Sequence, residues 1–197
     1  QTELKFLKSQ YHPHFLFNAL NTVYFQIDES NKAPRRTLEM ISELLRYQLY
    51  GGNQKVSILQ EIDYLKTYIA LRKLRMSERL RLRVEFPPEL NELNIYPLLF
   101  LPLVENAFKY VGGDYQLDII MKWENNRISL FIRNSIPELS AEDEALRKSV
   151  DKRQRKGIGL VNLRRRLSLL YPNKHRLETR KEETEFVAEL MIEIEDI

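Results

Sequence analysis

Apolar residues recur every three or four positions through the first third of the chain, which is the spacing of amphipathic helices. Three runs have this spacing: residues 4–27, 38–49 and 57–75. A polar stretch over residues 28–34 separates the first two runs, Gly51-Gly52-Asn53 ends the second, and Ser57 can cap the third. Their strong apolar faces need partners, so we expect a helical bundle that a second copy of the chain completes.

From Leu80 the apolar spacing changes to alternation, which is the period of a half-buried strand. We expect strands over residues 80–86, 116–123, 127–133, 176–181 and 185–194. The second and third of these strands are joined by Glu124-Asn125-Asn126, residue types that favour a hairpin turn.

Two further helices are expected among these strands. One covers residues 97–111, with a proline near its start, and the other covers residues 157–170. The highly charged residues 138–156 predict a mobile loop between them. The expected fold class is therefore α+β, with a helical module over residues 1–78 and an α/β module over residues 79–197.

Composition excludes several classes of function. The 31 basic and 28 acidic residues are interleaved and give a net charge of +3, which argues against nucleic-acid binding. The absence of cysteine excludes thiol nucleophiles, disulfides and Cys-ligated zinc, and three histidines argue against a multi-histidine metal site. No apolar run approaches the roughly 20 residues that cross a bilayer, and no signal peptide is visible. Because the chain begins at Gln1 inside a helical pattern, we expect it to be a fragment of a longer protein.

The first motif that could carry chemistry is a histidine next to a proline. A proline inside a helix costs about 3 kcal/mol, so Pro13 indicates a local distortion beside His14. Neutral imidazole is a competent nucleophile near neutral pH, and an exposed His14 could attack phosphorus. Taken alone, this motif favours the alternative, that His14 is an ordinary helical histidine beside a kink.

The second motif places three functional side chains on the helix expected over residues 97–111. Asn106 and Lys109 share one face, and Glu105 lies one position away from it. A carboxamide oxygen can bind Mg²⁺, a lysine can contact phosphate, and a carboxylate can act as a base. A solvated helix face explains the same residues equally well.

The third motif is Gly157-Ile158-Gly159-Leu160, at the start of the last expected helix. Glycines that open a helix let backbone N–H groups approach an anion at the positive end of the helix dipole. A short pair of glycines is a weak signal, because many helix caps have one.

Taken together, the three motifs strongly resemble the LytS-type sensor histidine kinases, from about Leu4 to Glu195. The resemblance rests on Pro13-His14-Phe15-Leu16-Phe17-Asn18, on Pro102-Leu103-Val104-Glu105-Asn106-Ala107, on the glycine motif, and on Tyr68 to Arg75. It implies a helical dimerisation and phosphoacceptor module, followed by a Bergerat-type α/β sandwich that binds ATP, the fold that gyrase, histidine kinases and MutL share.

The resemblance also implies a role for each site residue. His14 would be the phosphoacceptor, Glu105 a base, Asn106 the Mg²⁺ ligand, Lys109 a phosphate contact, Asn134 the adenine contact, and Gly157, Gly159 and Leu160 the lid hinge and phosphate cradle.

The chain departs from the family pattern at three places. His12 stands where the family often has Asn, and Tyr110 where it usually has His. The first glycine box has Asn134 in place of Asp and lacks its glycines. An amide oxygen accepts a hydrogen bond without a charge, so weaker ATP binding is expected.

The function expected from the resemblance is ATP-dependent phosphorylation of His14, with Mg²⁺, followed by transfer to an aspartate of a response regulator, of the LytTR type. We expect a homodimer that does not bind nucleic acid. The chain would be a cytoplasmic domain of an inner-membrane protein, attached to the membrane only through segments absent from this chain. Two alternatives remain: an inactive signalling scaffold with a degenerate nucleotide site, and an ATPase for which His14 is irrelevant.

Overall fold

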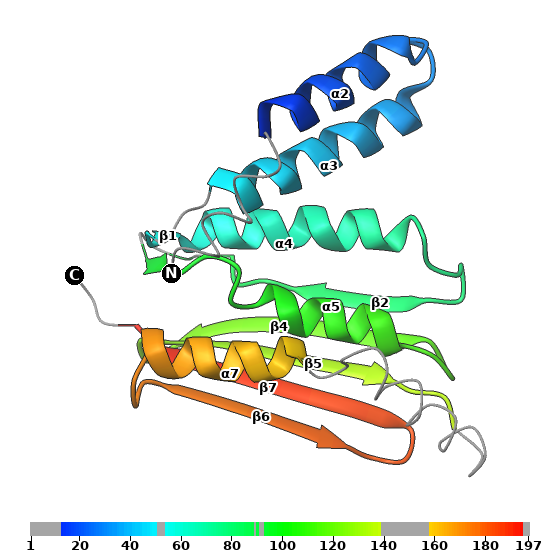
Figure 1. The fold of residues 1–197 in the computed structure, drawn as a ribbon. Coiled ribbons are helices and arrows are strands. Elements are labelled where there is room, and N and C mark those ends of the chain that lie inside the picture. The colour runs from blue at the N-terminus through cyan, green and yellow to red at the C-terminus, as the bar shows by residue number, and fades with distance from the viewer. Residues whose placement is uncertain (1–12, 51–53, 89, 91–92, 139–157, 195–197) are drawn as a thin grey trace.

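The computed structural model describes residues 13–50, 54–88, 90, 93–138 and 158–194. Three helices are stacked above a sheet in Figure 1: α2 (Pro13–Gln26), α3 (Lys32–Tyr50) and α4 (Ile58–Lys73). The helices α2 and α3 form an antiparallel hairpin, and α4 lies between this hairpin and the rest of the molecule.

The sheet has five strands in the order β2-β4-β5-β7-β6. The strand β2 is parallel to β4, and the other neighbours are antiparallel. The bounds are β2 Arg81–Glu85, β4 Gln116–Glu124, β5 Arg127–Ser135, β6 His175–Lys181 and β7 Glu185–Glu193. A separate two-stranded sheet pairs β1 (Val56–Ser57) with β3 (Asn94–Ile95).

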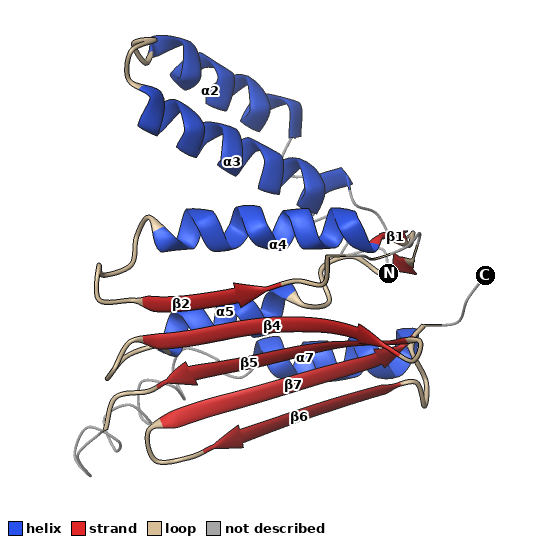
Figure 2. Cartoon of the chain, turned by 180° about the vertical axis from the view of Figure 1, so that it is seen from behind, coloured by secondary structure: helices blue, strands red, loops and turns tan. Residues whose placement is uncertain are grey.

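In the described part of the chain, the helices cover one face of the large sheet and leave the other uncovered. The helices α5 (Leu101–Tyr110) and α7 (Ile158–Leu170) lie across the covered face, and α4 lies beside α5 next to the β2 edge (Figures 1 and 2). Alternation along β4 and β5 points one set of apolar side chains toward the helices, each at most 2% exposed: Leu117, Ile119, Met121, Ile128, Leu130 and Ile132. The expected α+β fold class is confirmed.

The buried face of α4 is continuous with the core of the sheet. Its Ile58, Ile62, Leu65 and Ile69 are at most 5% exposed and belong to the same apolar cluster as the sheet residues. The α2 helix, by contrast, has no buried residue. The boundary near residue 78 stays a prediction, although the packing of α4 favours an earlier division.

Several local expectations are confirmed and one is wrong. Ser57 caps α4 in a capping box, and Asn125 and Asn126 have the positive φ angles of a tight hairpin turn. The helix expected from residue 97 begins instead at Leu101, because Leu98 has a φ of 58°, which a right-handed helix does not allow. The charged loop expected over residues 138–156 lies outside the described residues except for its first position.

Candidate functional site

The α5 helix positions the second motif. Its apolar residues Leu103, Val104, Ala107 and Phe108 are at most 3% exposed, so this side of the helix is fixed in the core. The neighbouring positions therefore face outward: Asn106 is half-buried, and Glu105 and Lys109 are exposed. These three side chains are available to a ligand that approaches α5 from its open side.

Asn134 lies at the end of β5 and is fully buried. The alternation of β5 places it on the same side of the sheet as Ile132, toward the helices. Its Nδ2 donates to the backbone oxygen of Ser135 at 3.2 Å, while Oδ1 is buried and has no hydrogen-bond partner in the described part of the chain. An unsatisfied buried acceptor costs about 1–3 kcal/mol, so this oxygen fits a donor supplied by a ligand, such as the adenine amino group.

The altered first glycine box, which begins at Asn134, packs directly on the loop that follows α5. The Ser135 hydroxyl donates to the backbone oxygen of Gly112 at 2.6 Å, and Gly112 N–H donates to the backbone oxygen of Ser135 at 3.0 Å. A Cβ on Gly112 would lie 2.9 Å from Cδ of Pro137. Gly113 has a φ of +59°, and a Cβ there would lie 3.0 Å from the Ile136 oxygen.

The glycines that permit this close approach thus stand on the α5–β4 loop and not in the box itself. Sequence reasoning noted the missing glycines after Asn134 but overlooked the pair Gly112-Gly113. The signal was present, because two adjacent glycines follow the asparagine motif directly.

The start of α7 provides open space next to this region. Its Leu163 and Leu167 are at most 2% exposed and anchor the helix on the sheet. Gly159 in the first turn is exposed, and a Cβ there would meet nothing within 4 Å, while Leu160 is half-buried. In Figure 1, the first turn of α7 points toward the end of the sheet where α5 and β5 end. The backbone N–H groups in the first turn of α7 suit a phosphate. Gly157, the other glycine of this motif, lies outside the described residues.

Glu105 is directed toward α4. The side chain as a whole is exposed, but partial burial of its carboxyl raises the pKa of Glu105, and the nearby charge of Arg72 opposes this shift. The Arg72 guanidinium carbon lies 5.7 Å from the centre of the Phe108 ring, and its Nε is buried without a partner in the described part of the chain. The raised pKa favours a Glu105 carboxyl that can take up a proton. The positive charge of Arg72 acts in the opposite direction and favours the carboxylate.

His14 is exposed in the first turn of α2, and its Nδ1 lies 3.1 Å from Nδ2 of Asn18. The α2 helix packs on α3, on the far side of α4 from the sheet (Figure 1). In the described structure, α4 lies between the helix of His14 and the elements that carry Asn106, Asn134 and Gly159 (Figure 1), so His14 is not brought to them.

A buried carboxylate that sequence reasoning missed joins α3 to the segment before α5. Glu61 of α4 is 0% exposed, and its Oε2 accepts from the Tyr47 hydroxyl of α3 at 2.7 Å and from Leu98 N–H at 2.9 Å. Burial raises the pKa of Glu61, and these hydrogen bonds and the charge of Arg166 on α7 oppose the rise. The available signal was a glutamate directly beside Ile62 on the apolar face of the helix.

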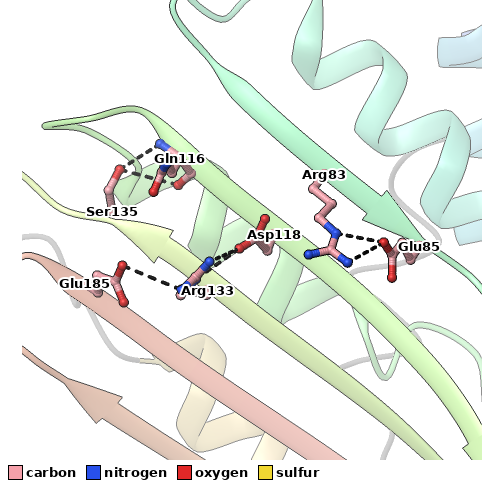
Figure 3. Close-up of polar contacts among 7 residues, drawn as sticks. All are labelled: Arg83, Glu85, Gln116, Asp118, Arg133, Ser135 and Glu185. Atoms are coloured by element: carbon pink, nitrogen blue, oxygen red, sulfur yellow. Dashed lines mark hydrogen bonds and ion pairs between the residues drawn. The ribbon is translucent and has the colours of Figure 1, made fainter.

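The opposite face of the sheet is charged and open. Arg133 contacts Asp118 at 2.6 Å and lies 4.0 Å from Glu185, and Arg83 pairs with Glu85 at 2.7 Å (Figure 3). Exposed ion pairs of this kind contribute little free energy, so we interpret this face as a solvated surface.

The described residues contain no cluster of three or more His, Cys, Asp or Glu side chains that could hold a metal ion. None of the helices in the same part of the chain is long and apolar enough to cross a membrane.

Comparison with known proteins finds a matching family model, similar sequences and similar solved structures. Residues 2–80 match the family model described as Histidine kinase. The Sensor protein kinase HptS of Staphylococcus aureus is 29% identical over 180 residues, which cover 89% of this chain and 35% of HptS. The chain thus spans about a third of the length of that relative.

Solved histidine kinase structures are similar at low identity. The catalytic domain of histidine kinase ThkA is 18% identical, with 71% of this chain and 93% of that chain covered and a TM-score of 0.46. Full-length ShkA in complex with AMPPNP is 13% identical, with 92% and 44% covered and a TM-score of 0.48. The sequence matches do not separate the LytS type from other histidine kinases, so that assignment stays a prediction. They support the coarser prediction, that this chain is part of an ATP-dependent histidine kinase of the sensor class.

Proposed function

We propose that this chain is the catalytic part of a LytS-type sensor histidine kinase that transfers the γ-phosphate of Mg-ATP to His14. The phosphate would then pass to an aspartate of a response regulator, of the LytTR type. The whole kinase would be attached to the inner membrane through segments outside this chain, which would lie in the cytoplasm.

The observation that carries the nucleotide part of this proposal is the Oδ1 of Asn134, which has no hydrogen-bond partner among the described residues. A fully buried amide oxygen without a donor is costly, and such a group is retained where a ligand satisfies it. Asn134 would accept a hydrogen bond from the adenine amino group. Because the amide carries no charge, this contact is weaker than one to a carboxylate.

The other residues at this end of the sheet would hold the phosphates. Asn106 would bind Mg²⁺ through its amide oxygen, and Lys109 would place a positive charge near the phosphates. Gly157, Gly159 and Leu160 would form the turn whose N–H groups face the phosphates at the start of α7. Glu105 is the candidate base for a proton on the imidazole.

Transfer would require a rearrangement, because α2 lies beyond α4 from the sheet. The contacts that hold α3 to α4 include Tyr47 to Glu61 at 2.7 Å and Gln48 to the Tyr64 hydroxyl at 2.6 Å. Either these contacts open so that the modules of one chain close, or the nucleotide of one subunit serves the His14 of another.

A homodimer formed through the hairpin would support the second route. The α2 helix has no buried residue, and Phe15, Val23 and Phe25 are 74%, 46% and 78% exposed. Large exposed apolar side chains on one helix are typical of a surface that another copy covers. Light scattering that finds only monomer at every concentration would contradict this part of the proposal.

The kinase proposal is tested by incubation with Mg²⁺ and ATP labelled on the γ-phosphate. We expect label that is stable in alkali and lost in acid, as a phosphohistidine is. The label should disappear in His14→Gln and in Asn106→Ala, and remain in His175→Gln, the matched control. Label that survives in His14→Gln would contradict the assignment of the phosphoacceptor.

One observation favours a second candidate, an inactive scaffold that keeps the fold. The segment after Asn134 carries Pro137 where the family has glycine-rich sequence, and Gly112 packs against it. Failure of the wild-type chain to bind ATP at millimolar concentration would favour this scaffold over the kinase.

A further inference from the structure

A hydrogen bond joins the side chains of His14 and Asn18, one turn apart on α2. Nδ2 of Asn18 lies 3.1 Å from Nδ1 of His14, and both side chains are exposed. Residues four apart share one face of a helix, so this contact needs no distortion of α2. Thr22, a further turn along, donates its hydroxyl to the backbone oxygen of Asn18 at 2.9 Å and not to the amide, which leaves the amide to His14.

This contact decides the chemical state of the imidazole. A neutral imidazole carries one proton and one reactive lone pair on its two ring nitrogens, and the hydrogen bond of one nitrogen sets the state of the other. Only a nitrogen with a free lone pair can attack phosphorus. Nδ1 faces Asn18, so Nε2 is the ring nitrogen that is open to a phosphate donor.

The amide of Asn18 can meet Nδ1 in two ways. When its NH₂ group donates, the proton of the ring lies on Nε2, and the ring has no free nucleophilic nitrogen. When the amide is turned by half a rotation about χ2, its oxygen accepts the proton of Nδ1, and Nε2 has a free lone pair. The two ends of an amide are similar in size, so this rotation needs no extra room at an exposed position.

We propose that Asn18 is a positioning residue for phosphoryl transfer: its amide pairs with Nδ1 of His14, selects the tautomer of the ring and directs the phosphate to Nε2. This inference rests on the proposed kinase function. It goes beyond that function because it assigns the residue that prepares the imidazole for reaction.

The transfer step balances without a separate proton acceptor. The Nε2 lone pair forms the bond to the γ-phosphorus while the bond from that phosphorus to the β–γ bridging oxygen breaks, and ADP leaves with that electron pair. The proton stays on Nδ1, held by the Asn18 oxygen, and the ring becomes a phosphoimidazolium. Glu105 would be needed as a base only for the tautomer that carries its proton on Nε2.

Three variants separate this role from a structural one. Asn18→Asp can only accept a hydrogen bond, so it holds the proton on Nδ1 and should keep Nε2 reactive. Asn18→Leu has a similar size and no polar group, so it should release the ring. Asn21→Leu makes the same change at another exposed asparagine of α2 and is the matched control.

The first measurement is the tautomer of His14, read from ¹⁵N NMR of the full chain at a pH where the ring is neutral, with His14→Gln to assign the signals. In Asn18→Asp we expect the ring proton on Nδ1. In Asn18→Leu we expect the tautomer ratio to change roughly two- to tenfold from wild type, the range that one ordinary hydrogen bond supports. Equal tautomer ratios in wild type, Asn18→Asp and Asn18→Leu would overturn the inference.

The second measurement is the position of the phosphate. Phosphoramidate phosphorylates histidine without an enzyme, so it tests Asn18 independently of ATP. We expect the Nε2 isomer in wild type, Asn18→Asp and Asn21→Leu, and a larger share of the Nδ1 isomer in Asn18→Leu. The same isomer ratio in Asn18→Leu and wild type would contradict the proposal.

The third measurement uses Mg-ATP and keeps the two proposals apart. We expect Asn18→Leu to label roughly two- to tenfold more slowly than wild type, with unchanged ATP affinity, because Asn18 does not contact the nucleotide. Equal labelling rates would overturn the role of Asn18 alone. A wild-type chain that takes no label from ATP would overturn the proposed kinase function, while the first two measurements still decide whether Asn18 controls the ring.

Discussion

Replacing Glu61 tests how α3 is joined to the segment before α5. The carboxylate is fully buried and accepts from the Tyr47 hydroxyl at 2.7 Å and from Leu98 N–H at 2.9 Å. Glu61→Ala leaves both donors without an acceptor. Each such group costs about 1–3 kcal/mol, so we expect a loss of roughly 2–6 kcal/mol in the free energy of unfolding.

Glu61→Gln tests the charge separately from the shape. Burial raises the pKa of Glu61 in the folded chain, so the folded state binds its proton more tightly than the unfolded state. The stability that this proton contributes is full below the ordinary pKa of a glutamate and is lost as the pH rises through the folded pKa. The amide introduced by Glu61→Gln does not titrate, and the stability of this variant relative to wild type should therefore rise over that interval.

The size of this rise in relative stability follows from the size of the pKa shift of Glu61. Each unit by which the pKa is raised corresponds to about 1.4 kcal/mol. Urea unfolding of wild type and Glu61→Gln, at several pH values from 5 to 8, gives the difference directly, and Glu78→Gln at an exposed position is the matched control. A difference that stays constant or falls with pH would refute the raised pKa.

Three further changes test the site and the core. Asn134→Ala should weaken ATP binding roughly 5- to 150-fold, the equivalent of about 1–3 kcal/mol for one buried hydrogen bond, and calorimetry that finds unchanged affinity would remove its adenine contact. Gly113→Ala should lower the melting temperature, because its φ of +59° and the 3.0 Å approach to the Ile136 oxygen both oppose a side chain; an unchanged melting temperature would contradict this. A chain that starts at residue 54 should fold, whereas one that starts at residue 79 should not, since it loses the four aliphatic residues of α4 that are buried in the core of the sheet, worth about 6–12 kcal/mol. Circular dichroism of a folded 79–197 chain would support the boundary predicted at residue 78.

Regular elements could be predicted because their signals are local. Ser57 caps its helix through the residues that follow it, and Asn125-Asn126 tolerate the positive φ of a tight turn. The strands β4 and β5 were predicted close to their observed bounds, since each is a continuous run between turn residues. These features need no knowledge of distant parts of the chain.

The features that were missed depend on contacts between distant segments. The predicted helix starts later than expected because the turn before α5 presents the N–H of Leu98 to Glu61, which is 37 residues away. Gly112 is required because Pro137, on another loop, approaches it. Periodicity along one segment contains no information about such partners, so only the folded arrangement could assign them.

The candidate site was predicted as residue types and not as an arrangement. The roles of His14, Asn106 and Asn134 came from the resemblance and stay predictions. What the structure adds is the burial of Asn134, whose Oδ1 has no hydrogen-bond partner among the described residues, and the separation of α2 from the sheet by α4. Neither could be read from the motifs, because both depend on how the modules pack.

The most direct test of the account is to locate the phosphate after incubation of the chain with Mg-ATP, by mass spectrometry under conditions that preserve phosphohistidine. The account predicts phosphate on His14 in wild type and none in Asn106→Ala, whose fold should be intact. Phosphate on another residue, or no phosphate on a wild-type chain that binds ATP, would contradict it.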